Sequence, residues 1–157
     1  MFRPRSLAFA TALAVLAGCP LLAAHVPTAS AATFNVCSGC SYSSIQSALN
    51  AAHNGDVIHI GPGTFAGGIT ILNSVKMIGA GAGATIIQGG GPVVTIGSAD
   101  TTSEPTVSIS GVTITGGSNT SVPDPSQPRG GGIWVPQAAG GGPGATVSIS
   151  DSVIRGN

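Results

Sequence analysis

Two stretches decide the fold: DVIHIGPGTFAGGITILNSVKMIGAGAGATIIQGGGPVVTIGS at residues 56–98 and TVSISGVTITGG at residues 106–117. Both consist of short runs rich in Val, Ile and Thr, and glycine-rich turns separate most of these runs. Val, Ile and Thr favour β-strands, whereas glycine clusters mark turns. Such brief runs, repeated at close intervals, fit the flat faces of a chain that winds in stacked coils.

The predicted strands follow one another along most of the chain. A Gly-Pro-Gly turn at residues 61–65 separates the second strand from the third. The predicted strands are residues 33–36, 57–60, 69–72, 76–78, 85–88, 93–96, 106–110, 112–115, 133–135, 146–150 and 153–154.

An internal repeat supports the stacking. Thr-Val-Ser-Ile-Ser occupies residues 106–110 and recurs at residues 146–150, an offset of 40 residues that we interpret as two coils of about 20. Alternation within the repeat places Val and Ile inward and Ser outward. The predicted inward residues of the first copy and the residues after it are Val107, Ile109, Val112 and Ile114. Their predicted counterparts in the second copy are Val147, Ile149, Val153 and Ile154. The sequence therefore predicts an all-β protein, a right-handed parallel β-helix.

A single amphipathic helix precedes the coils. In SYSSIQSALNAAHNGD, the residues Ile45, Ala48, Leu49 and Ala52 fall on one face of a helix. Ser43 or Ser44 can cap its start, and the Asn54-Gly55 pair favours its end. A stack of coils exposes its core at each end, so we expect this helix to close the N-terminal end.

The first 31 residues have the organisation of a signal peptide. Arg3 and Arg5 precede a largely apolar run, and Ala29-Ser30-Ala31 is a small-x-small cleavage site that leaves Ala32 as the first mature residue. The run is short for a membrane span. We therefore expect a secreted, extracellular protein without a membrane span.

A competing signal ends at Cys19. Leu16-Ala17-Gly18-Cys19 resembles the lipobox of bacterial lipoproteins, so anchoring through a lipidated Cys19 is the alternative localisation. The apolar segment continues past this cysteine through Pro20-Leu21-Leu22, which favours soluble secretion.

Residues 32–42 form a lead-in that contains Cys37 and Cys40. Export favours a small structural disulfide between these two cysteines over redox chemistry or a zinc site. Only 6% of the residues are charged, with five basic against five acidic side chains, so no basic face for nucleic acid is expected.

Residues 42–65, YSSIQSALNAAHNGDVIHIGPGTF, resemble the opening of bacterial β-helix proteins of the pectin-lyase-like superfamily. The segments GGGIWV at residues 130–135 and SDSVIRGN at residues 150–157 are similar to repeats of polymorphic outer-membrane and related surface β-helices. The resemblance covers residues 42–157 and implies the fold, which we assign to residues 43–157, with further coils expected beyond residue 157. One such solenoid hosts lyases, hydrolases and adhesins, so it does not imply one activity.

Candidate site residues are few. Lyases of this superfamily combine calcium-binding carboxylates with a basic residue, and hydrolases cluster aspartates, but no two acidic residues here occupy equivalent positions on successive predicted coils. We therefore assign no catalytic residue and no cofactor. Asp100 and Glu104 share one predicted loop and could hold calcium.

Trp134 and Arg155 are the candidate binding residues. Trp134 alternates with two aliphatic residues, so it should face outward, where an indole ring can stack on a sugar. We expect a noncatalytic surface, adhesive or glycan-binding protein whose partner is a polysaccharide or cell-surface glycan. The alternatives are the N-terminal part of a polysaccharide lyase or glycoside hydrolase, and a purely structural cell-wall protein.

Overall fold

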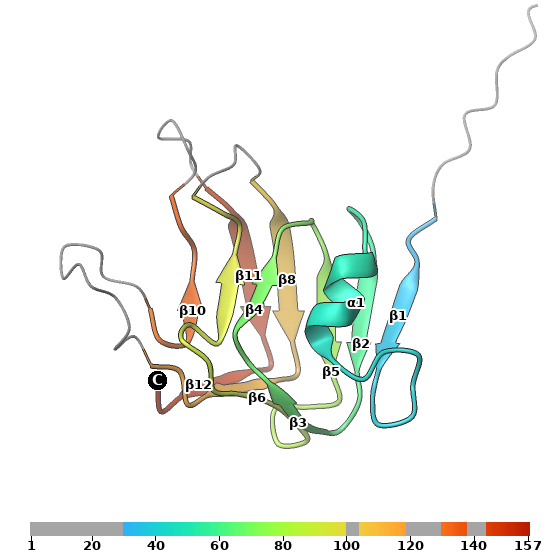
Figure 1. Cartoon of the computed structure of the whole chain (residues 1–157), viewed down its shortest axis with the longest axis horizontal. Coiled ribbons are helices and arrows are strands. Elements are labelled where there is room, and N and C mark those ends of the chain that lie inside the picture. The colour runs from blue at the N-terminus through green and yellow to red at the C-terminus, as the bar shows by residue number, and fades with distance from the viewer. Residues whose placement is uncertain (1–29, 100–103, 119–129, 138–143) are drawn as a thin grey trace, which may run out of the picture.

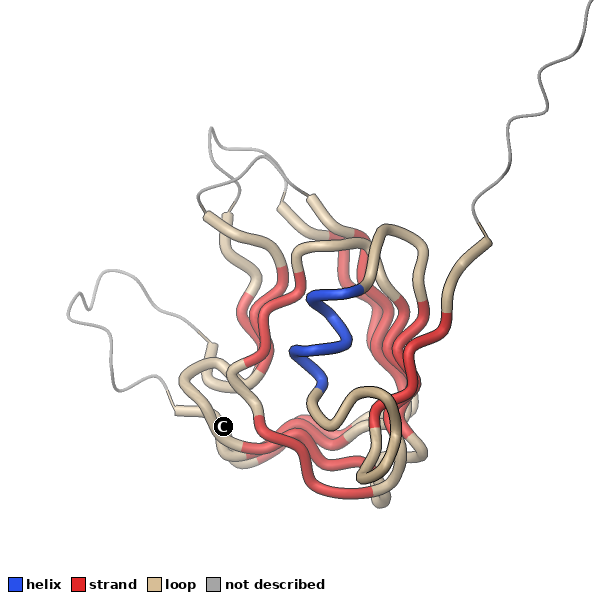
Figure 2. Tube along the Cα trace, turned by 45° about the vertical axis from the view of Figure 1, so that its right-hand side comes forward, coloured by secondary structure: helices blue, strands red, loops and turns tan. Residues whose placement is uncertain are grey.

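The computed structural model describes residues 30–99, 104–118, 130–137 and 144–157. Within these ranges the chain is mostly β-structure, arranged as three parallel sheets around a common interior (Figures 1 and 2). Residues 1–29, which contain Cys19 and most of the expected signal peptide, lie outside the described residues.

Successive passages of the chain add one strand to each sheet, and we call one such passage a layer. Sheet A has the order β1 (Thr33–Val36), β2 (Val57–Ile60), β5 (Lys76–Gly79), β8 (Thr106–Ser110) and β11 (Thr146–Ser150). Sheet B contains β3 (Gly63–Ala66), β6 (Thr85–Gln88), β9 (Thr113–Thr115) and β12 (Val153–Arg155), and sheet C contains β4 (Ile69–Ile71), β7 (Val94–Ile96) and β10 (Ile133–Trp134). The described strands thus confirm an all-β fold with parallel sheets.

Ladders of aliphatic side chains fill the interior. In sheet A, Ile58, Met77 and Ile109 occupy matching register positions and are fully buried. The predicted inward residues Val107, Ile109, Val112 and Ile114 are all buried, as the alternation predicted. Layers approach so closely that a Cβ on Gly79 would lie 2.2 Å from the carbonyl oxygen of Gly111, which explains a glycine at that position.

The interpretation of the repeat as two coils is wrong. Strand β11 pairs directly with β8, with Thr146 opposite Thr106 and Ser150 opposite Ser110, so the two copies are in parallel register one layer apart. Long insertions between the strands make up the 40-residue offset, because residues 116–130 and 136–144 separate β9, β10 and β11. Residues 119–129 and 138–143 of these insertions lie outside the described part of the chain.

Two further expectations need correction. Residues 63–66 form strand β3 rather than a turn, because Phe65 lies in register with Ile87 of sheet B. Val153 pairs with Thr113 and not with Val112, so the predicted match of Val153 with Val112 is wrong by one residue. Ile149 and Ile154 are 40% and 48% exposed because no described layer covers them. Val153 is 42% exposed because it lies next to the core-facing Ile154 in β12 and so faces outward, not inward as predicted.

Helix α1 (Ile45–Ala51) contacts strands of two sheets, β1 and β2 of sheet A and β4 of sheet C. Ile45, Ala48 and Leu49 are buried against the interior, and Figure 2 shows the helix lying across the space that the sheets enclose. Ser44 is the N-cap, and its hydroxyl accepts a hydrogen bond from the backbone N–H of Ser47. The helix ends at Ala51, before Asn54 and Gly55, which instead form the turn into β2.

Candidate functional site

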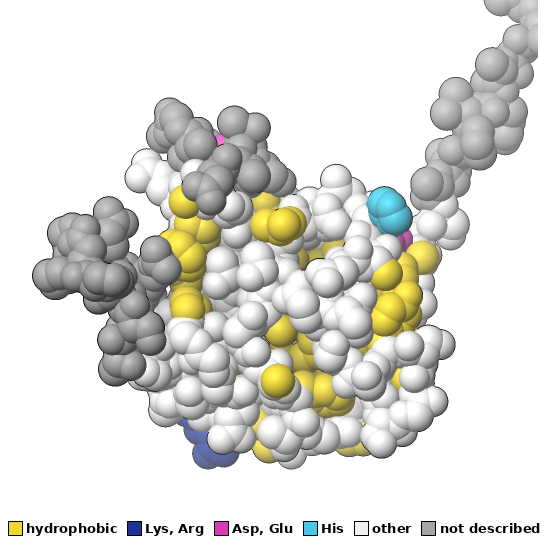
Figure 3. All heavy atoms as spheres, in the orientation of Figure 1, with side chains coloured by type: hydrophobic (Ala, Val, Ile, Leu, Met, Phe, Trp, Pro, Cys, Tyr) yellow, Lys and Arg dark blue, Asp and Glu magenta, His cyan; other side chains and the backbone are white. Residues whose placement is uncertain are grey.

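Trp134 lies on the outward face of sheet C. It pairs with Thr95 of β7, and Thr95 pairs with Thr70 of β4, so the three side chains form one ladder across the sheet. The neighbour Ile133 packs against the core, which by strand alternation directs Trp134 outward. The indole is half-buried. Figure 3 shows a stripe of hydrophobic side chains on this side of the molecule, in the region of β10.

A hollow lies on the outward face of sheet A, beside the N-terminal loop. Its volume is about 390 Å³, and the register places Asn35 next to His59 and His59 next to Ile78. Pro62 and the two cysteines complete its wall. Pockets of this size accept small ligands, and the lining offers one amide, one imidazole and several apolar groups.

Sequence reasoning missed this hollow. Alternation along β2 directs His59 outward, where it is exposed between two buried isoleucines. Its proximity to Asn35 depends on the register between β1 and β2, which the intervening helix hides from the sequence.

Cys37 and Cys40 are joined by a disulfide with a Cα–Cα distance of 5.0 Å. The backbone N–H of Cys40 donates to the carbonyl of Cys37, and that of Cys37 donates to the carbonyl of Tyr42. The disulfide therefore closes a tight loop between β1 and the helix, and both cysteines line the hollow described above.

The structure does not bring the remaining candidate residues together. Arg155 is exposed on β12 of sheet B, opposite Thr115, and so lies on a different sheet from Trp134. Glu104 is exposed, while Asp100 lies outside the described residues, so a calcium site at this pair stays a prediction. In the described ranges, no three His, Cys, Asp or Glu side chains gather where they could hold a metal ion.

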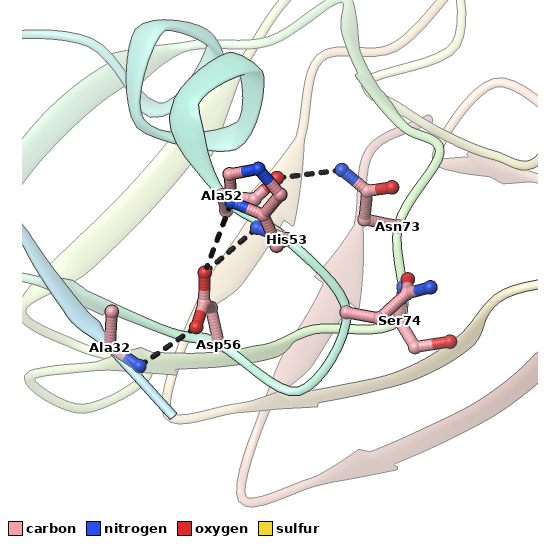
Figure 4. A network of polar contacts seen from close by, with 7 residues as sticks. Ala32, Ala52, His53, Asp56, Asn73 and Ser74 are labelled. Carbon is pink, nitrogen blue, oxygen red and sulfur yellow. Dashed lines mark hydrogen bonds and ion pairs between the residues drawn. The ribbon is translucent and has the colours of Figure 1, made fainter. Parts of the chain in front are cut away.

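Asp56 is a buried carboxylate at the start of β2 (Figure 4). Its Oδ2 accepts a hydrogen bond of 2.8 Å from the backbone N–H of His53, and its Oδ1 accepts one of 2.7 Å from the backbone N–H of Ala32. The bond from His53, and then that from Ala32, stabilises the ionised form and holds the pKa of Asp56 below its usual range. His53 lies beyond the helix rather than in its last turn, with an exposed ring whose Nδ1 is 4.0 Å from Oδ2.

Among the described residues, no helix is long and apolar enough to cross a membrane. Comparison of the chain with models of protein families, with curated proteins and with solved structures finds no match in any of the three. The function must therefore be argued from the surfaces that the described residues form.

Proposed function

We propose that the chain is an exported right-handed parallel β-helix with a noncatalytic surface role, and that it binds glycans through the outward face of sheet C. The three parallel sheets and the layer-by-layer order of the strands support the fold. The contacts of α1 with both sheet A and sheet C support its role as a cap on the N-terminal end. The resemblance of residues 42–65 to pectin-lyase-like proteins supports the same assignment.

The observation that carries the binding proposal is the ladder formed by Trp134, Thr95 and Thr70. An indole presents a flat apolar face that stacks on the C–H face of a sugar ring, and hydroxyl groups beside it can bond to the sugar hydroxyls. The ladder runs across the strands, so its groups recur at the strand spacing of about 4.8 Å. A repeating, uncharged polymer suits such a ladder better than a single compact ligand.

The test is binding of the chain from Ala32 to insoluble and soluble polysaccharides, measured by co-sedimentation and by calorimetry. Trp134→Ala should weaken binding about tenfold, which corresponds to about 1.4 kcal/mol of stacking. Val135→Ala is the matched control, because Val135 is the exposed apolar neighbour on the same segment. Arg155→Ala tests the other candidate residue on a different sheet.

Equal binding by the native chain and Trp134→Ala would overturn the assignment of the site to sheet C. Loss of binding in Arg155→Ala alone would move the site to sheet B. The same preparations should be incubated with pectate and other uronic-acid polymers in the presence of calcium. Release of an unsaturated product would contradict the noncatalytic role and favour the lyase alternative.

A further inference from the structure

Ala32 is the first described residue whose backbone is hydrogen-bonded to the rest of the fold. The N–H of Ala32 donates to Oδ1 of Asp56 at 2.7 Å, and its carbonyl accepts from the N–H of Val57 at 2.9 Å. Pairing of β1 with β2 begins one residue later, at Thr33. Ser30 and Ala31 are exposed, and no hydrogen bond joins them to another described residue.

Asp56 is a buried carboxylate whose hydrogen-bond donors among the described residues are neutral backbone N–H groups. It is 6% exposed, and within the described part of the chain its only ion-pair contact is with His53, whose side chain is 90% exposed. Solvent screens such a contact. The two backbone N–H donors stabilise the ionised carboxylate, but neither carries a full charge, so a cation at one of these two positions would stabilise it further.

We propose that Asp56 is a capture site for the α-ammonium group of Ala32, which is created when the signal peptide is removed after Ala31. Hydrolysis of the Ala31–Ala32 peptide bond by an export peptidase consumes one water, leaves a carboxylate on Ala31 and leaves an amino group on Ala32. That amino group is mostly protonated at neutral pH. The inference rests on the proposed export and is independent of glycan binding.

The geometry needs no rearrangement. The nitrogen of Ala32 already lies at the distance of a charge-assisted hydrogen bond from Oδ1, which is typically about 2.7–2.9 Å for such pairs. Processing replaces one neutral N–H donor by a cation at the same position, and so adds a full positive charge beside the Asp56 carboxylate. Figure 4 shows Ala32 and His53 approaching the carboxylate from opposite sides, each through its backbone nitrogen. Removal of the signal peptide therefore stabilises the closed end of the fold.

The first experiment exports the full chain from a bacterial host and determines the intact mass and N-terminal sequence of the product. We expect Ala32 as the first residue. Any other first residue would overturn the proposal, whatever the outcome of the glycan assays.

The second experiment compares two chains that both start at Ala32, one with a free amino group and one acetylated on that nitrogen. Acetylation keeps an N–H donor and removes only the charge. The free-amine chain should melt several degrees higher, and Asp56→Asn should abolish that difference. Glu104→Gln, which alters an exposed carboxylate, is the matched control and should preserve it.

Equal melting temperatures of the free and acetylated chains would overturn the proposal, as would a difference that survives in Asp56→Asn. The acetylation comparison uses the native sequence, so it tests whether the charge on Ala32 stabilises the fold even where Asp56→Asn fails to fold. A third chain that begins at Ala31, with its ammonium one residue away, should melt with the acetylated chain.

Discussion

The two ends of the stack cover their core residues in different ways. At the N-terminal end, α1 lies over the interior and buries Ile45, Ala48 and Leu49, and Asp56 ties the entering chain to the start of β2. At the other end, the side chains of β11 and β12 continue the core ladders but have no described layer above them. Ile109 is fully buried, whereas Ile149, its register partner in an identical pentapeptide, is 40% exposed.

This difference teaches that burial in a stacked fold is a property of the neighbouring layers and not of the local sequence. The same five residues are a core strand in one layer and a half-exposed edge in the next. Stability should accordingly follow position in the stack, as expected when each unit contacts only its neighbours.

The largest effect should come from truncating the two register partners separately. Ile109→Ala should lower the free energy of unfolding by about 3–4 kcal/mol, because it leaves a cavity between covered layers. Ile149→Ala should lower it by about 1 kcal/mol, because the side chain is partly in solvent and its surroundings can relax. Urea unfolding followed by circular dichroism measures both values.

Similar losses for the two variants would contradict the comparison, since they would mean that Ile149 is covered as fully as Ile109. The pentapeptides are identical, so each variant serves as the sequence-matched control for the other.

The core could be predicted from the sequence because alternation within a strand is local. Val107, Ile109, Val112 and Ile114 were assigned from the pattern of one segment, and each is buried. The number of residues per layer was not predictable in this way, because loops of any length can separate stacked strands at little cost in closure entropy. The direct pairing of Thr106 with Thr146 could therefore not be predicted from the local pattern, because it joins two strands that the insertions separate in the sequence.

The candidate sites also depend on contacts between residues far apart in the sequence, which the local pattern does not predict. The outward direction of Trp134 follows from its two neighbours, but its alignment with Thr95 and Thr70 follows from the register of three strands. The bond between Ala32 and Asp56 joins residues 24 apart. The sequence does not single out Asp56 as a partner of Ala32, since nothing local to it indicates which backbone nitrogen its carboxylate will accept from.

A smaller effect should separate the two serines that could cap α1. Ser44→Ala removes the acceptor for the backbone N–H of Ser47 and should cost about 1 kcal/mol. Ser43→Ala should change the free energy of unfolding by less than about 0.5 kcal/mol, because Ser43 is exposed and precedes the cap. Chemical unfolding of both variants measures the difference.

Equal effects of the two substitutions would show that the cap hydrogen bond does not stabilise the closed end. A loss in Ser44→Ala should also increase amide hydrogen exchange in α1 more than in β8, because the helix makes its main strand contacts with β1, β2 and β4.

The smallest effect is confined to acid and concerns Asp56. Its folded-state pKa is lowered from a usual value of 3.8, first by the backbone N–H of His53 and then by that of Ala32. A carboxylate with a depressed folded pKa stabilises the protein fully above its unfolded pKa, and this contribution is lost as the pH falls through the folded pKa. The native chain should therefore lose stability below about pH 4, and Asp56→Asn should flatten that part of the pH profile. Asp151→Asn, which removes an exposed carboxylate from the opposite end of the described stack, is the matched control for the loss of one acidic side chain. An unchanged slope in Asp56→Asn would mean that the two backbone bonds do not favour the ionised carboxylate in the folded state.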